Sequence, residues 1–79
     1  MNLALMTLVV HLGQIDNIKD VSATHHKVKI YYNDYEKLDL NAIKNLPGIS
    51  GVFINNKAID LIVGNQAALV ATALQDLIN

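Results

Sequence analysis

The sequence predicts an α+β fold, a two-layer sandwich in which a four-stranded antiparallel sheet carries three helices on one face in the order αββαββα. Two patterns lead to this expectation. Apolar residues recur at helical spacing near both ends of the chain and once in its middle, and short alternating runs stand in pairs between them. Because each pair of runs has a short polar connection, antiparallel pairing is expected, with the amphipathic helices packed together on one side.

The first half of the chain is expected to form one helix and two strands. The helix covers about residues 3–12 and ends at Gly13, a residue that commonly follows a helix. One apolar stripe carries this expectation: Leu5, Leu8, Val9 and Leu12. A short strand over residues 18–21 follows, and a longer strand over residues 27–32 alternates apolar residues with lysines and a tyrosine.

The middle of the chain predicts a short helix and a hairpin. Asp39 is a suitable N-cap for a helix of about two turns that stops at Pro47, and Leu38 is placed to pack against Ile43. Strands are expected over residues 51–54 and 58–63. The residues between them, Asn55 and Asn56, tolerate the positive φ that a tight hairpin requires.

A last amphipathic helix is expected after Gly64. Its stripe leaves Gln75 and Asp76 outside. The stripe consists of Leu69, Val70, Ala73, Leu74, Leu77 and Ile78. With no repeat, linker or charge block, the residues 1–79 are interpreted as a single domain.

The composition excludes several classes of function. The chain is 52% hydrophobic with a formal charge of −1, so it should bury a core and offers no broad basic surface for nucleic acid. It contains no cysteine, which removes disulfides, thiolate metal sites and thiol nucleophiles. The first apolar run spans about ten residues, half of what a membrane helix needs, and lacks the features of a secretory signal. We therefore expect a cytoplasmic protein without direct membrane insertion.

One segment suggests an anion site. Residues 20–28 are interpreted as a strand end, a turn of small polar residues including Ser22 and Thr24, and a strand start carrying His25 and Lys27. Consecutive backbone N–H groups and a hydroxyl at such a turn can hold an anion, helped by nearby cations. Taken alone, however, a small-residue turn between two strands is most often only a turn.

A longer series of residues gives this segment a context. The series runs through the whole chain: Leu12-Gly13, Asn17-Ile18, Asp20, Thr24, Gly51-Val52, Ile62 and Gly64. At this spacing the chain resembles the IIB domains of glucose-family sugar phosphotransferase systems over about residues 3–78. The agreement extends to the order of helices and strands, so several levels of the sequence point to one fold.

The resemblance implies a role in phosphoenolpyruvate-dependent sugar uptake. In that family a cysteine accepts a phosphoryl group from a histidine of the IIA component and passes it to a sugar bound in the membrane-embedded IIC component. The family pattern around this cysteine is Asp-x-Cys-x-Thr-Arg-Leu-Arg, followed by a supporting glutamine on a later strand. In this chain Ser22 stands at the cysteine position, His25 and Lys27 at the two arginines, His26 at the leucine and Asp60 at the glutamine, while Asp20 and Thr24 are kept.

These exchanges weaken the family's chemistry at the site. A serine hydroxyl needs an adjacent base to become a nucleophile, and a phosphoserine is a poor phosphoryl donor. Histidine replaces a permanently charged guanidinium fork, and Asp60 would place a carboxylate near the phosphate. We therefore expect a degenerate domain that docks onto IIA, IIC or a related regulator, without a cofactor, and that reaches the membrane only through IIC. Whether the chain is an enzyme stays open.

Three alternatives remain at this point. The chain could be a phosphotransfer component that is active in its natural form, with its cysteine exchanged for Ser22. His25 or His26 could accept the phosphoryl group instead, although adjacent strand residues face opposite sides. His11, His25 and His26 could bind a metal, but their spacing fits no known site, so none is expected.

Overall fold

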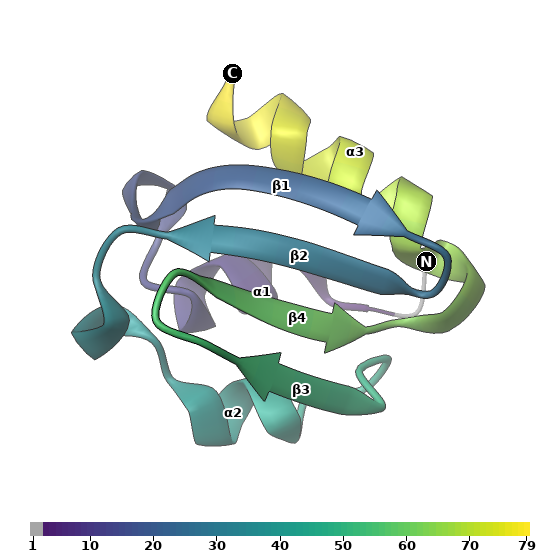
Figure 1. Ribbon diagram of the computed structural model, residues 1–79, viewed down its shortest axis with the longest axis horizontal. Helices are drawn as coiled ribbons and strands as arrows, with labels where there is room; N and C mark the ends of the chain where they lie inside the picture. The colour runs from purple at the N-terminus through teal and green to yellow at the C-terminus, as the bar shows by residue number, and fades with distance from the viewer. Residues whose placement is uncertain (1–2) are drawn as a thin grey trace.

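A four-stranded antiparallel sheet covers three helices in the computed structural model, which describes residues 3–79 (Figure 1). The helices are α1 (Leu5–His11), α2 (Leu40–Lys44) and α3 (Ala67–Ile78). The strands are β1 (Ile18–Thr24), β2 (Lys27–Tyr32), β3 (Gly51–Ile54) and β4 (Ala58–Ile62). Short 3₁₀ turns occupy Ile15–Asn17, Tyr35–Lys37 and Gly64–Gln66. The predicted fold class and element order are confirmed.

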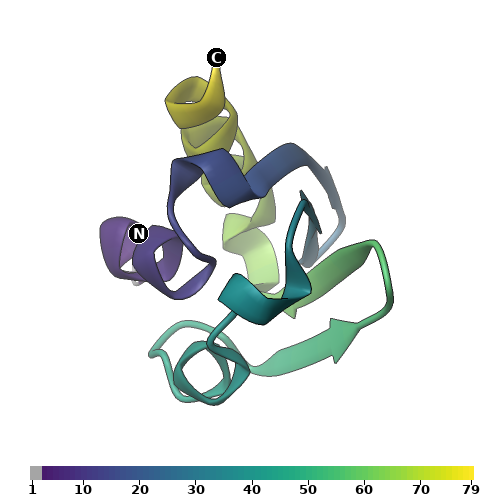
Figure 2. The same ribbon diagram turned by 90° about the vertical axis from the view of Figure 1, so that its left-hand side faces the viewer.

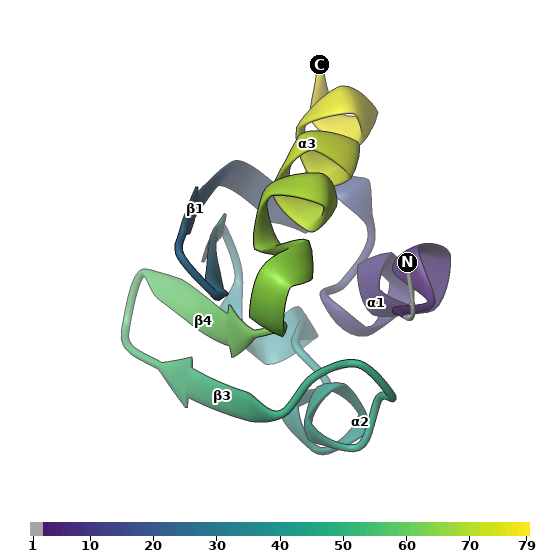
Figure 3. The same ribbon diagram turned by 90° about the vertical axis from the view of Figure 1, so that its right-hand side faces the viewer.

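The sheet has the strand order β1-β2-β4-β3, so β2 and β4 are central and β1 and β3 form the edges. Figures 2 and 3 show the sheet from its two ends, with all three helices on the same side. The alternation of the strands explains this arrangement, because residues of one parity are buried against the helices. The sheet contributes these residues to the core: Ile18, Val21, Val28, Ile30, Tyr32, Ile59 and Leu61.

The helices cover the sheet with small apolar stripes. Leu8, Val9 and Leu12 of the α1 segment are at most 1% exposed, and Ile43 of α2 is fully buried. The N-cap expected for α2 is confirmed, because a carboxylate oxygen of Asp39 accepts a hydrogen bond of 3.1 Å from the backbone N–H of Ala42. This bond satisfies one of the donors that a helix start leaves unpaired.

The stripe expected on α3 is partly wrong. Val70 and Leu74 are fully buried as expected, together with Ala67 and Ala71, but Leu69 is 62% exposed. Gln75, expected outside, is half-buried, and its side-chain N–H donates a 2.7 Å hydrogen bond to the carbonyl of Val21. The buried side of α3 differs from the expected one because the helix packs mainly along the edge strand β1, with its small residues Ala67 and Ala71 in the core.

Asn17 is the buried polar residue of the core, and it joins two connections. Its amide donates to the carbonyl of Leu12 at 2.7 Å and to that of Asp34 at 3.0 Å, and its oxygen accepts from the Asp34 N–H at 2.7 Å. Both N–H donors and the side-chain oxygen therefore have a partner, as burial requires. Asn17 therefore fixes the end of α1 and the end of β2 against each other.

The hairpin between β3 and β4 forms where it was expected, but by a different turn. Neither Asn55 nor Asn56 has positive φ, since the non-glycine residues of the described chain with positive φ are Gln14 and His25. Instead, the side-chain oxygen of Asn55 accepts hydrogen bonds of 2.8 Å from the N–H groups of both Lys57 and Ala58. An asparagine side chain thus takes the place of the backbone in closing the turn.

Candidate functional site

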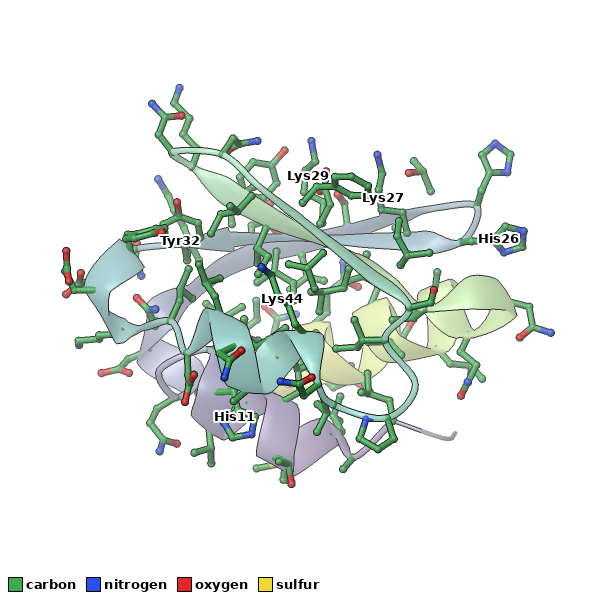
Figure 4. All side chains as sticks on the ribbon, turned by 90° about the horizontal axis from the view of Figure 1, so that it is seen from below. His11, His26, Lys27, Lys29, Tyr32 and Lys44 are labelled. Atoms are coloured by element: carbon green, nitrogen blue, oxygen red, sulfur yellow. The ribbon has the colours of Figure 1, made fainter. Side chains whose placement is uncertain are left out.

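One face of the sheet has no helix over it, and we call it the open face. Its residues alternate with those of the core. They are Asp20, Ser22 and Thr24 of β1, Lys27, Lys29 and Tyr31 of β2, Gly51 and Phe53 of β3, and Ala58, Asp60 and Ile62 of β4. Figure 4 shows the side chains of Lys27 and Lys29 pointing away from the helices. Because residues two apart on one strand share a face, the chain places these polar side chains together.

The centre of the open face is a row that crosses all four strands. In register, Ser22 pairs with Lys29, Lys29 with Asp60, and Asp60 with Phe53. Residues opposite each other in such a ladder have their Cβ atoms about 4.5–5.5 Å apart. A hydroxyl, an ammonium group, a carboxylate and an exposed aromatic ring therefore follow one another across the sheet, and Phe53 is 63% exposed.

Ser22 lies inside β1 rather than in a turn, which corrects the expectation for this segment. The strand continues through Thr24, and the connection to β2 is the pair His25 and His26. His25 takes the positive φ of 50° that this tight connection requires. The backbone N–H groups of residues 22–24 belong to an antiparallel strand, so they do not form the anion-holding turn that the sequence suggested.

The hydroxyl of Ser22 is exposed and has no activating neighbour. Its side chain makes no hydrogen bond to any of the residues 3–79, whether to a histidine, to a carboxylate or to the backbone. A serine nucleophile needs a base within hydrogen-bonding distance to lose its proton. The geometry therefore provides a hydroxyl that can contact a partner but no group that would take its proton.

Asp60 and Lys27 form an ion pair beside the central row. The ammonium nitrogen of Lys27 lies 3.8 Å from Oδ2 of Asp60, and the side chains are 41% and 15% exposed. The other oxygen, Oδ1, is buried without a hydrogen bond in the described part of the chain. An unpaired buried acceptor costs free energy, so Oδ1 of Asp60 is an unfavourable feature within the fold, and only the remaining exposed part of this carboxylate can meet a partner.

Five of the six residues singled out by sequence meet on the open face: Asp20, Ser22, Thr24, Lys27 and Asp60. The sixth, His25, lies at the end of the hairpin. Sequence reasoning did not include Lys29 and Phe53, which flank Asp60 on either side. The alternation of β2 already placed Lys29 on the same side as Lys27, and this signal could have identified it.

The three histidines do not form a metal site. Figure 4 shows His11 on α1, beneath the sheet, and His26 at the far end of the hairpin. Within residues 3–79 no three side chains of the types that bind metals gather at one place. A metal bound jointly by His11, His25 and His26 would need ligands from separate parts of the molecule.

None of the described helices is long and apolar enough to span a bilayer. The sequence matches no protein-family model and no curated protein. A solved structure does match, described as "The crystal structure of one domain of the PTS system, IIabc component from Clostridium difficile". The likeness has a TM-score of 0.78 at 17% identity and covers 95% of this chain and 78% of that one. This chain therefore shares the fold of a domain of a phosphotransferase-system component.

Proposed function

We propose that this chain is a IIB-like domain of a phosphoenolpyruvate-dependent sugar phosphotransferase system that docks onto partner components through its open face and does not itself relay the phosphoryl group. The observation that carries the proposal is the central row, in which Ser22 stands beside Lys29 and Lys29 beside Asp60; the resemblance aligns Ser22 with the family's cysteine. The shared fold with a domain of a IIabc component supports the same assignment.

The open face has the composition of a protein-binding surface. Phe53 is exposed at one end of the central row, on the edge strand β3, with the carboxylate of Asp60 beside it. Aromatic side chains are enriched at protein interfaces, where a ring that becomes buried can supply much of the affinity. A IIA or IIC component, or a regulator of the same shape, is the proposed partner.

The absence of a base beside Ser22 supports docking over phosphoryl transfer. In the family, a thiolate attacks the phosphorus of a phosphohistidine, the P–N bond breaks and an S–P bond forms. In this chain the attacking group would be a hydroxyl that keeps its proton. Lys27, which stands at the position of a phosphate-binding arginine, is held by Asp60 instead.

The test is incubation with a phosphorylated IIA component, followed by intact-mass measurement of this chain and of the Ser22→Cys variant. We expect the unmodified chain to gain no phosphoryl group while it still binds IIA in a pull-down or titration. The variant restores a thiol, and a slow gain of one phosphoryl group is expected. Ser22→Ala serves as the matched control and should behave as the unmodified chain.

Stable labelling of Ser22, His25 or His26 in the unmodified chain would contradict the docking proposal and favour an active relay. Peptide mapping of the labelled protein distinguishes these three positions. Failure to bind IIA and IIC in either phosphorylation state would reject the proposed partners. Either outcome leaves the fold assignment untouched, because that assignment depends on the structural likeness alone.

A further inference from the structure

A hollow of about 410 Å³ opens at the end of the sheet opposite to the His25-His26 connection. It lies between β1, the end of β2 and the turn that joins β3 to β4. Its lining residues are Lys19, Asp20, Tyr31, Tyr32, Asn56 and Lys57. Figure 4 shows Tyr32 at one end of the sheet and His26 at the other. The volume falls within the range of about 300–1,000 Å³ that small-molecule sites occupy.

We infer that this hollow binds a phosphorylated sugar. The two lysines supply ammonium groups for a phosphate, Tyr31 supplies an aromatic face for a sugar ring, and Asp20 and Asn56 supply acceptors and donors for hydroxyls. Neither Lys19 nor Lys57 forms an ion pair within residues 3–79, and these two lysines outnumber the one carboxylate of the lining, that of Asp20. An anion of small size is the ligand that this charge arrangement favours.

The carboxylate of Asp20 has one oxygen in a hydrogen bond and one without a hydrogen-bond partner in the described chain. Its Oδ1 accepts the backbone N–H of Val21 at 2.8 Å, and Oδ2 makes no hydrogen bond in the described chain. A free carboxylate oxygen would repel a bare phosphate, yet it accepts hydrogen bonds from hydroxyl groups. The site therefore favours a ligand that carries hydroxyls beside its phosphate over inorganic phosphate alone.

The walls of the hollow are held by specific contacts. Lys19 lies at a break in the β1–β2 register between Ile18 and Asp20, a place where a bulge redirects a side chain. The side-chain oxygen of Asn55 accepts a hydrogen bond from the backbone N–H of Lys57. The backbone carbonyl of Asn55 accepts one from the Tyr32 hydroxyl at 2.5 Å. Hydrogen bonds thus connect the hairpin turn to β2. Because the backbone that lines the hollow is already ordered, a ligand would bind with little change in its conformation.

The inference does not depend on the proposed function. Lys57 and Tyr31 lie outside the central row, and no phosphoryl transfer is required for binding. If this chain docks onto sugar-transport components, a sugar phosphate would be the product of their reaction, and the hollow would report its concentration. Partner binding and ligand binding can be measured separately, so either idea can fail alone.

The experiment is a titration of the ¹⁵N-labelled chain with glucose 6-phosphate, followed by amide chemical shifts. We expect saturable shifts that centre on Lys19, Tyr31 and Lys57, with an affinity at least about tenfold tighter than that for inorganic phosphate or for glucose. Lys57→Gln should lower the affinity about fivefold or more, because an ammonium contact to the phosphate is lost. Lys44→Gln on α2 is the matched control and should change nothing, and thermal unfolding checks that both variants fold.

Three results would overturn the inference. The first is the absence of saturable shifts at millimolar glucose 6-phosphate. The second is equal affinity for inorganic phosphate, which would mean that Tyr31 and Asp20 contribute no recognition of a sugar. The third is equal weakening by Lys57→Gln and Lys44→Gln, which would indicate a response to overall charge rather than to the hollow.

Discussion

Tyr32 illustrates how one residue connects the core to the hairpin turn between β3 and β4. Its ring is 7% exposed and its hydroxyl donates to the carbonyl of Asn55. Burial raises the pKa of Tyr32 above its usual value, and the neighbouring Tyr35, with ring centres 6.1 Å apart, raises this pKa further. The neutral phenol is therefore the form that the folded state prefers.

This preference predicts a loss of stability in alkali. Because the folded-state pKa is raised, the stabilisation is complete below the unfolded-state pKa of 10.0 and disappears as pH rises through the folded-state value. Tyr32→Phe should lower the free energy of unfolding by about 0.5–1.5 kcal/mol at neutral pH, and this difference should shrink above pH 10. Urea unfolding at several pH values measures it. Tyr31→Phe is the control: it keeps Tyr32, so its free energy of unfolding should still fall above pH 10. If the free energies of unfolding of Tyr32→Phe and of the unmodified chain differ by the same amount at every pH, the loss in alkali does not come from Tyr32.

Asp60 predicts a preference between two states of a partner. Under the proposed docking to IIA, the negative charge of this carboxylate should repel a phosphohistidine more strongly than an unphosphorylated histidine. Asp60→Gln should therefore raise the affinity for phosphorylated IIA relative to unphosphorylated IIA on the order of tenfold, measured by calorimetry. Asp76→Asn on α3 removes the same charge from another layer and should leave the ratio unchanged. If Asp60→Gln leaves the ratio of the two affinities unchanged, the Asp60 carboxylate does not discriminate between phosphorylated and unphosphorylated IIA.

At the scale of elements, the connection after α1 is the most constrained. Gly13 has a φ of 97°, and a Cβ there would lie 2.6 Å from Cβ of Lys37 and 3.0 Å from the amide nitrogen of Asn17. Asn17 in turn holds the segment that follows β2. The end of one helix is thus pressed against a later turn, so neither can shift without the other.

Gly13→Ala is expected to cost about 2–4 kcal/mol of unfolding free energy, because backbone strain at positive φ adds to the contact with Lys37. Gly64→Ala is the matched control. Its φ is 69° and a Cβ there would meet nothing within 4 Å, so only the strain of about 1–2 kcal/mol should appear. Denaturant unfolding of both variants measures the difference. If both variants lose the same unfolding free energy, Lys37 moves away from the new Cβ at residue 13 without a measurable loss of stability.

At the scale of the whole molecule, charge is divided between the two layers. The open face and its hollow carry Lys19, Lys27, Lys29 and Lys57 against Asp20 and Asp60, a surplus of two positive charges. The helices and the other connections carry two lysines against five acids, a deficit of three. The net charge of −1 hides this division, which directs an acidic partner to the open face.

Association with a partner should therefore depend on salt. Raising the ionic strength from about 0.05 M to about 0.5 M should slow association several-fold, since the screening length falls from about 14 Å to about 4 Å. The double variant Lys27→Gln with Lys29→Gln should show slower association and a weaker salt dependence, whereas Lys44→Gln should resemble the unmodified chain. Stopped-flow or surface-based kinetics measure both. If association of the double variant depends on salt as strongly as that of the unmodified chain, Lys27 and Lys29 are not the source of the electrostatic attraction.

The sequence was sufficient for the order of elements, and it named five candidate residues that share the open face. Alternation and helical spacing are local properties, so they identified each strand and helix, and the family pattern located Ser22 and Asp60. The details that were missed depend on contacts between distant segments. The rotation of α3 follows from packing on β1, and the turn at Asn55 follows from a side chain that replaces the backbone.

The pairing across the sheet explains the remaining gap at the site. Lys29 and Phe53 join Asp60 only through the strand order β1-β2-β4-β3, in which β4 lies between β2 and β3. That order brings together residues 31 positions apart in the case of Lys29 and Asp60. A hairpin pattern alone does not state which strands become central, so the central row could not be assembled from the sequence.

The hydrogen bond from Gln75 to the carbonyl of Val21 has a consequence for solubility. Edge strands present unpaired backbone groups to which a strand of another molecule can add, and this is a common route to aggregation. In this chain α3 occupies that carbonyl of β1 with a side-chain amide at 2.7 Å. An incoming strand would have to displace the Gln75 side chain from this carbonyl, so extension of the sheet at β1 is disfavoured at that position.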